Sequence, residues 1–311
     1  MGRFAYTTCR KTGSQWVKDV LTDPQIFAAQ GLHYHQPPDK YRADAFAAEP
    51  DGTFVAPAFD LSYDRWHQVA GPDDRCVVVV RDPRDVVVSW AFSMAYSHAT
   101  DAEVRIIRPA MLALDLRGKL EVTTFVIKDP LRVQRSWVRG APTARARVYR
   151  FEDLVADEVG TFGSMLDYFG WTVDATNLRA AVARHTFSAR TGGRERGDKN
   201  PFSHYRNALP GDWRNYFDQD LGQRFEAALP GLVRELGYER ADDWWTAQPE
   251  KIAELTLGAV ETERLRTELA VARAELARVR VAAEGLLRRY EALEELERQL
   301  ARRAAEVGGR G

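Results

Sequence analysis

The sequence predicts an α/β domain built on a central parallel sheet, followed by a long C-terminal coiled-coil helix. Short β-rich runs alternate with helical patterns through the first part of the chain, which is typical of a parallel sheet covered by helices. The composition changes near Pro249, the last proline, and from Glu250 onward there is no Trp, Phe or Cys. We therefore predict two domains, residues 1–247 and residues 250–311.

The expected elements follow from apolar periodicity and from turn residues. Runs rich in β-branched and aromatic residues predict strands at Phe4–Thr8, Thr53–Phe59, Cys76–Val80 and Ala146–Arg150. Amphipathic patterns predict helices at Ser14–Leu21, Tyr63–Val69, Asp85–Tyr96, Gly160–Phe169, Leu178–Arg184 and Leu221–Leu236, the last open to interruption at Pro230. Gly, Pro and charged residues in Arg190–Leu209 predict a long loop.

The overall charge and composition restrict the classes of partner. The 311-residue chain carries 44 Lys and Arg against 45 Asp and Glu, a formal net charge of -1. This balance removes the bulk electrostatic case for binding nucleic acid or an anionic membrane. Two cysteines are too few for a disulfide framework, and no apolar run approaches the ~18 residues of a membrane span. We expect a cytoplasmic protein without a nucleic-acid or membrane partner.

A heptad pattern predicts the coiled coil. Its apolar positions are separated alternately by four and three residues: Leu265, Leu269, Ala272, Leu276, Val279, Ala283, Leu286, Tyr290 and Leu293. In a parallel pair of helices the flanking residues would pair with opposite charge, as Glu268–Arg273, Glu275–Arg280 and Arg289–Glu294. We expect a homodimer through this helix. The alternatives are a single solvated helix held by intrahelical ion pairs and a helix that folds back on the head.

The first segment that suggests chemistry is Cys9-Arg10-Lys11-Thr12-Gly13-Ser14-Gln15-Trp16. It lies between an apolar strand and an amphipathic helix, so it offers an anion backbone N–H groups, hydroxyls and one ammonium group. It is not a Walker A loop, because the lysine precedes the single glycine. By itself this segment also fits a plain turn with a solvated lysine.

The second segment runs from a fully apolar strand directly into a helix, with Arg81 at the carboxyl end of the strand. Ligands bind at that end of the strands in open parallel sheets. Asp82 before Pro83 is a good N-cap with proline at the first helical position. The alternative role for Arg81 is a salt bridge to Asp82 or Asp85.

The third segment, Ser203–Phe217, ends the predicted loop. It combines Trp213, which we expect to be buried, with a basic approach that includes Arg206. Taken alone, it fits a loop closed onto the core by the tryptophan.

Together, and in this order, the segments resemble the sulfotransferases that use 3′-phosphoadenosine 5′-phosphosulfate (PAPS). Arg10–Trp16 is similar to the family's P-K-S-G-T-T-W loop, Arg81–Ser89 to R-x-P-(K/R)-D-V-x-V-S, and Arg206–Phe217 to R-K-G-x-x-G-D-W-(K/R)-x-x-F. Phe151–Leu154 looks like a family Y-E-D-L segment. The resemblance covers about residues 3–238. It implies a P-loop-like three-layer domain that uses PAPS, releases 3′-phosphoadenosine 5′-phosphate (PAP) and needs no metal.

The resemblance also implies roles at the 5′ end of the co-substrate. Lys11 would contact the bridging oxygen and the 5′-phosphate, and Trp16 would stack on adenine. The residues expected to form the surrounding cradle are Thr12, Gly13, Ser14 and Gln15.

At the 3′ end, the resemblance implies that Arg81 and Ser89 hold the 3′-phosphate from one side and Arg206 from the other. Guanidinium forks and hydroxyls suit a doubly charged phosphate. Thr186 and Phe187 resemble family residues that contact adenine.

The sequence departs from the family pattern at several positions. The expected Lys-Gly after the loop arginine is Asn207-Ala208, which removes one cation and one glycine, so we expect a lower affinity for the co-substrate. Phe151 replaces a common tyrosine and lacks its hydroxyl.

The general base is not evident, because the strand that carries a histidine in many family members has none here. The candidates are Asp60, just after that strand, and His33 or His35, which could border the acceptor cleft. His33 and His35 also suggest a metal pair, but no third ligand accompanies them, so no metal is expected.

Three functions remain open. The first is transfer of a sulfuryl group from PAPS to a hydroxyl or an amine of a small-molecule or carbohydrate acceptor. The second is a P-loop-type small-molecule kinase. The third is a non-catalytic coiled-coil assembly protein with a degenerate sulfotransferase head.

Overall fold

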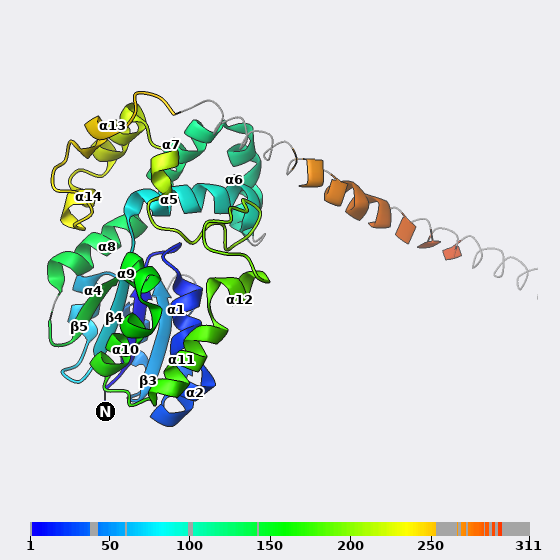
Figure 1. Cartoon of the computed structure of the whole chain (residues 1–311). Coiled ribbons are helices and arrows are strands. Elements are labelled where there is room, and N and C mark those ends of the chain that lie inside the picture. The colour runs from blue at the N-terminus through cyan, green and yellow to red at the C-terminus, as the bar shows by residue number, and fades with distance from the viewer. Residues whose placement is uncertain are drawn as a thin grey trace, which may run out of the picture. The chain divides into compact units, whose positions relative to one another are not determined.

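The computed structural model describes residues 2–37, 43–59, 61–98, 102–141 and 143–252. In the C-terminal segment it describes residues 266, 269–271, 273–282, 284–285, 288–289 and 292–293. The chain divides into two units, Met1–Gly258 and Ala259–Gly311. All the strands of the described residues belong to the first unit (Figure 1).

A five-stranded parallel sheet forms the centre of the first unit, as far as the residues are described. Its strands are β1 (Phe4–Thr8), β2 (His33–His35), β3 (Thr53–Phe59), β4 (Arg75–Val80) and β5 (Ala146–Arg150). They are ordered β2-β3-β1-β4-β5, and each neighbouring pair is parallel. The predicted α/β class with a central parallel sheet is confirmed. The sequence missed β2, because a three-residue edge strand is too short to produce a period-two pattern.

The first part of the chain surrounds the sheet with helices, and it adds a π-helical turn, η2, after α5. These elements are α1 (Ser14–Leu21), α2 (Pro24–Phe27), η1 (Ala28–Gln30), α3 (Ala43–Ala48), α4 (Tyr63–Val69), α5 (Pro83–Phe92), η2 (Ser93–Ser97), α6 (Ala102–Ala113), α7 (Leu116–Val126) and α8 (Lys128–Gly140). After β5 follow α9 (Phe151–Ala156), α10 (Glu158–Phe169), α11 (Ala175–Arg184), α12 (Phe187–Thr191), η3 (Asp212–Asn215), α13 (Gln219–Ala228), α14 (Leu232–Glu235) and η4 (Trp244–Ala247).

The sheet is buried on both faces, which explains the nearly continuous apolar runs of its central strands. Phe4 and Tyr6 point into one core, formed with α1, α10 and α11. Ala5 points into the other, where Trp66 of α4 and Trp137 of α8 pack. The helices therefore form a layer on either side of the strands (Figure 1).

Some helix boundaries differ from those predicted. The helix predicted at Asp85–Tyr96 is α5 followed by the π-helical turn η2. The helix predicted at Leu221–Leu236 is interrupted between Ala228 and Leu232, where proline and glycine follow each other. Helices α6 to α8 were not predicted.

The predicted coiled coil is not shown. Several of its apolar positions, including Leu265, Ala272 and Leu286, lie outside the described residues. The described residues of this segment are helical, and Leu276 and Val279 are 69% and 58% exposed. None of the described helices is long and apolar enough to cross a membrane.

Candidate active site

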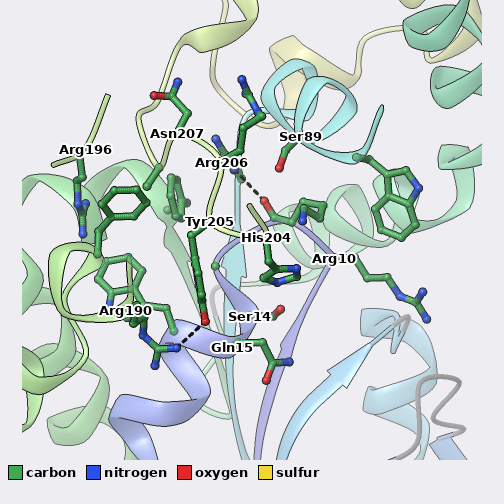
Figure 2. A pocket seen from close by; sticks show the side chains of 18 of the residues that line it. Arg10, Ser14, Gln15, Ser89, Arg190, Arg196, His204, Tyr205, Arg206 and Asn207 are labelled. Atoms are coloured by element: carbon green, nitrogen blue, oxygen red, sulfur yellow. Dashed lines mark hydrogen bonds between the residues drawn. The ribbon is translucent and has the colours of Figure 1, made fainter. Parts of the chain in front are cut away.

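A cavity of about 340 Å³ opens at the carboxyl edge of the sheet. The loops after β1 and β4 both contribute to it, together with Phe59 at the end of β3. Strands β1 and β4 are neighbours whose connections leave in opposite directions, so the cavity lies at the topological switch point of the sheet. The other side of the cavity comes from α5, α12 and the loop before Leu209 (Figure 2).

Most of the residues predicted to bind the co-substrate line this one cavity. They are Lys11, Gly13, Ser14, Gln15, Trp16, Arg81, Ser89, Phe187, Arg206 and Asn207. Thr12 and Thr186 do not line it: the Thr12 hydroxyl donates to the Cys9 carbonyl at 2.5 Å, and the Thr186 hydroxyl accepts from the Ala189 N–H at 3.2 Å. These two hydroxyls therefore hold the loop after β1 and the start of α12.

The loop between β1 and α1 has an unusual backbone. Lys11 has φ 66° and Gly13 has φ 79°, so two residues of the loop adopt the left-handed conformation. A non-glycine residue in that region is strained and persists only where its surroundings hold it. Thr8 supplies part of that support, because its hydroxyl lies against the Thr12 hydroxyl and donates to the Val79 carbonyl at 2.7 Å.

The ammonium group of Lys11 lies among other cations. Its Nζ donates to the Ser93 hydroxyl at 3.1 Å. Burial, with the nearby charges of Arg81 and Arg206, lowers the pKa of Lys11 to about 7. A lysine so placed gains from any anion that enters the cavity.

Arg81 is held at the end of β4 with only 6% of its surface exposed. It donates through Nη1 to the Lys11 carbonyl at 2.9 Å, and its guanidinium lies 4.4 Å from the centre of the Phe151 ring. The alternative salt bridge is also present, since Nη2 lies 3.7 Å from a carboxylate oxygen of Asp85. Asp85 in turn accepts a hydrogen bond from the Trp213 backbone N–H at 2.9 Å. This bond connects α5 to the third segment, Ser203–Phe217.

Arg206 approaches from the loop before η3. It pairs with Asp212 and donates to the Tyr216 hydroxyl at 3.4 Å. Lys199 reinforces that carboxylate at 2.8 Å. Burial acts to raise the pKa of Asp212, but the charges of Arg206 and Lys199 outweigh it and hold the pKa low.

Trp16 forms an aromatic wall of the cavity. It packs edge-on against Phe151 and Phe162, with ring centres 6.2 and 5.7 Å away. Arg196 lies over the Trp16 ring at 5.0 Å and pairs with Glu158. One side of the Trp16 indole therefore already carries a cation.

The charge of the lining is one-sided. It includes six Arg and Lys side chains and, among the described residues, no Asp or Glu: Arg10, Lys11, Arg81, Arg190, Arg196 and Arg206. Sequence reasoning placed Arg190 and Arg196 in a long loop and His204 and Tyr205 in the third segment, without giving any of these four residues an individual role in the site. The net charge of -1 gives no general attraction for anions. A binding site for an anion in this chain therefore requires a local surplus of cations, such as this one.

Several buried donors of this cavity have no partner among the described residues. They include Nε of Arg81, Nε of Arg206 and the indole N–H of Trp16. Buried polar atoms are rarely left unpaired, and each unpaired one costs about 1–3 kcal/mol. The donors therefore fit an anionic, partly aromatic ligand with phosphate groups, such as PAP.

Of the three base candidates, the structure describes only His33 and His35. Asp60 lies outside the described residues. His35 pairs with Val55 in the sheet, four positions before Phe59, and its Nδ1 lies 2.7 Å from Glu49. Neither His33 nor His35 lines the cavity. No group of three or more His, Cys, Asp or Glu suited to a metal ion occurs within the described ranges.

The fold and this cavity define a class of protein: an α/β domain that directs Lys and Arg donors at an anion from the carboxyl edge of a parallel sheet. Residues 66–237, more than half of the chain, match the sulfotransferase domain family. The chain therefore belongs to that family, as its motifs indicated.

Comparison with solved structures supports the fold through one neighbour, mouse sulfotransferase SULT7A1. The structure of mouse sulfotransferase SULT7A1 complexed with PAP matches 76% of this chain and 87% of its own, with 16% identity and a TM-score of 0.53. Retinol dehydratase in a complex with retinol and PAP is 13% identical over 75% of this chain and 81% of its own, with a TM-score of 0.44. The sulfotransferase from Alicyclobacillus acidocaldarius is 15% identical over 75% and 96%, with a TM-score of 0.35. No curated protein matches the sequence.

Proposed function

We propose that this protein transfers the sulfuryl group of PAPS to a hydroxyl, or an amine, of a small-molecule or carbohydrate acceptor. The observation that carries the proposal is the pair of buried guanidinium groups, Arg81 and Arg206, whose Nε atoms lack partners in the described structure. They flank the same cavity as Lys11, and no carboxylate from the described residues lines it. The PAP in the mouse SULT7A1 crystal is the product that such a reaction would release.

The chain's own residues would contribute binding and charge stabilisation. Arg81, Arg206 and the Ser89 hydroxyl would hold the 3′-phosphate, far from the reacting sulfur. Binding energy from a remote group of this kind orients the reacting group for in-line attack.

Lys11 would act at the reacting end. As the bond between sulfur and the 5′-phosphate oxygen breaks, negative charge develops on that oxygen, and the ammonium group would stabilise it. A fixed charge aimed at developing charge is commonly the largest contribution to catalysis. Gly13, Ser14 and Gln15 would close the cradle at the start of α1, with Trp16 against adenine.

The test is an acceptor screen with sulfur-labelled PAPS in the presence of a chelator. We expect labelled product with at least one hydroxyl or amine acceptor, and no need for a divalent metal. The Lys11→Ala variant should lower kcat much more than it weakens PAP binding. Turnover of ATP that requires magnesium, with none of PAPS, would instead support the kinase.

Tight PAP binding with no turnover across the panel would favour the non-catalytic assembly protein.

We also propose that the C-terminal helix joins two chains in a parallel homodimer. Exposed Leu269, Leu276 and Val279 support this, because exposed apolar residues at heptad spacing gain from a partner helix. The competing intrahelical pair between Arg280 and Glu284, at 3.1 Å, is available to a lone helix.

A further inference from the structure

We propose that His204 is the general base that takes the proton from the acceptor hydroxyl. This inference rests on the proposed function, in which the general base is unassigned because β3 carries no histidine. The residue lies two positions before Arg206, on the loop that closes the cavity, and its imidazole points into that cavity (Figure 2).

The composition of the cavity leaves few bases. Its described lining contains no carboxylate and three histidines, His98, His185 and His204. Both ring nitrogens of His185 are engaged, Nε2 with Asp23 at 3.0 Å and Nδ1 with Arg190 at 3.3 Å. His185 is therefore held as a structural group, and the choice lies between His98 and His204.

The backbone on either side of His204 is firmly anchored. Arg194 donates through Nη2 to the Ser203 hydroxyl at 2.9 Å and to the Tyr205 carbonyl at 2.7 Å. The Tyr205 hydroxyl accepts from Arg190 at 2.9 Å, as the dashed line in Figure 2 shows. These contacts hold the loop that carries His204 in place.

The His204 ring is free to accept a proton. Within the described part of the chain, neither of its nitrogens has a hydrogen-bond partner, and its ring packs edge-on against Tyr205 at 5.4 Å. The side chain is exposed to the solvent of the cavity, so an acceptor hydroxyl can reach it. A general base needs such direct access.

The charges around His204 keep it neutral before the co-substrate binds. Lys11, from the loop after β1, is the main cause of a lowered pKa of about 4. Partial burial of the ring, which still leaves one side open, and His98, which follows η2, contribute less. The other ionisable groups of this lining are Arg10, Arg81, His185, Arg190, Arg196, Tyr205 and Arg206. A neutral imidazole has the lone pair that a base requires.

The co-substrate would then switch His204 on. The negative charges of PAPS compensate Lys11 and so remove the main cause of the low pKa. The acceptor oxygen forms a bond to sulfur while its proton passes to His204, and the bond from sulfur to the 5′-phosphate oxygen breaks with its electron pair on that oxygen. When PAP leaves, Lys11 again lowers the pKa of His204, and the proton returns to solvent.

The first experiment measures proton uptake when PAP binds to the full-length chain. Calorimetry in buffers of different ionisation enthalpy gives this number. At about pH 5.5 Lys11 is already protonated, because its pKa is about 7. Ionisation of the PAP phosphates, with pKa about 6, contributes equally to every variant and cancels in the comparison.

We expect His204→Asn to lower the proton uptake by about half a proton or more at this pH. His98→Asn and the distant surface variant His67→Asn should retain it. The proposal would be overturned if His98→Asn lowered the proton uptake and His204→Asn left it unchanged. Equal proton uptake in all variants would overturn it as well. Failure of PAP to bind the wild type would reject the proposed function itself, which is a different outcome.

The second experiment compares phenol with 4-nitrophenol as acceptor probes at saturating PAPS. At about pH 8 4-nitrophenol is already largely ionised and needs no base, whereas phenol does. His204→Asn should lower kcat with phenol about 100-fold or more and change it much less with 4-nitrophenol. Equal losses with both probes would mean that His204 only supports the loop.

Discussion

Lys11 combines a left-handed backbone, a buried ammonium group and two neighbouring guanidinium groups. Each of these features is unfavourable in the empty cavity. Residues held in such conformations cluster at functional sites, where the surrounding structure maintains the strain. A bound anion would offset the clustered positive charge, whereas the backbone strain is maintained by the surrounding structure.

The pH dependence of PAP binding follows from the pKa of Lys11. That pKa is about 7 in the free protein, and a bound anion raises it, so the affinity should fall as the pH rises above about 7. In Lys11→Arg the group stays charged, and the slope should become shallower. Calorimetry from about pH 6 to pH 9 measures both slopes. Identical slopes would show that another group controls binding in this range.

Asn207 and Ala208 stand where the family has Lys-Gly. Ala208 has φ 56°, the left-handed conformation that glycine adopts without strain. Ala208→Gly should therefore raise Tm by about 2–4 °C, the shift that ~1 kcal/mol produces in a domain of this size. Adding Asn207→Lys should tighten PAP binding about threefold to tenfold through the extra cation.

The control is Ala180→Gly within helix α11, where the backbone is right-handed and glycine is unfavourable. Its Tm should fall. A fall in Tm for Ala208→Gly as well would show that the alanine at that position is not strained.

At the scale of elements, the turn from β1 into α1 depends on Gly13. Gly13 has φ +79°, and a Cβ there would lie 3.1 Å from the Phe151 ring. We predict that Gly13→Ala lowers stability by about 1 kcal/mol and weakens PAP binding about tenfold, because the turn that carries Lys11 shifts. Thermal unfolding and calorimetry measure the two effects.

Gly170, at the end of α10, provides a matched control. It has φ +74°, but a Cβ there would meet nothing within 4 Å, and it does not line the cavity. Gly170→Ala should lose similar stability and keep full PAP affinity. If Gly170→Ala also weakened PAP binding, the effect of Gly13→Ala could not be ascribed to the turn.

The central strands could be predicted from sequence because a parallel sheet buried on both faces produces unbroken apolar runs, as in Val77–Val80. Helices α6 to α8 were missed for different reasons. α6 contains Pro109, which argues against a helix. α8 has an amphipathic pattern that was overlooked, with Leu131, Gln134 and Trp137 on its buried face. The break between α13 and α14 was foreseen at Pro230.

The candidate site was predictable where a motif fixes a backbone conformation, as for Lys11, Arg81 and Arg206. It was not predictable where loops meet in space. His204 lines the cavity from a loop that Arg190 and Arg194 anchor through Tyr205 and Ser203. Sequence spacing carries no information on such contacts.

At the scale of the whole molecule, we predict that the C-terminal helix controls assembly and not catalysis. Removing everything after Pro249 should convert a dimer into an active monomer, because the cavity belongs entirely to residues before that point. Light scattering measures the mass of the full-length and truncated chains. The exposed ion pairs between the two helices, worth ~0.2–1 kcal/mol each, would set the register of the helices more than the strength of the dimer. A dimer mass that persists in the truncated chain would refute the coiled coil as the assembly device.

The most direct test of a PAPS-dependent sulfotransferase is a calorimetric comparison of PAP with adenosine 5′-phosphate, in chelator and at one pH. The two ligands differ only in the 3′-phosphate, which Arg81, Ser89 and Arg206 would bind. Two hydrogen bonds to charged groups, at about 1.5–3 kcal/mol each, predict that PAP binds about 100-fold tighter or more. Equal affinities for the two nucleotides would contradict the assignment of this cavity to PAPS.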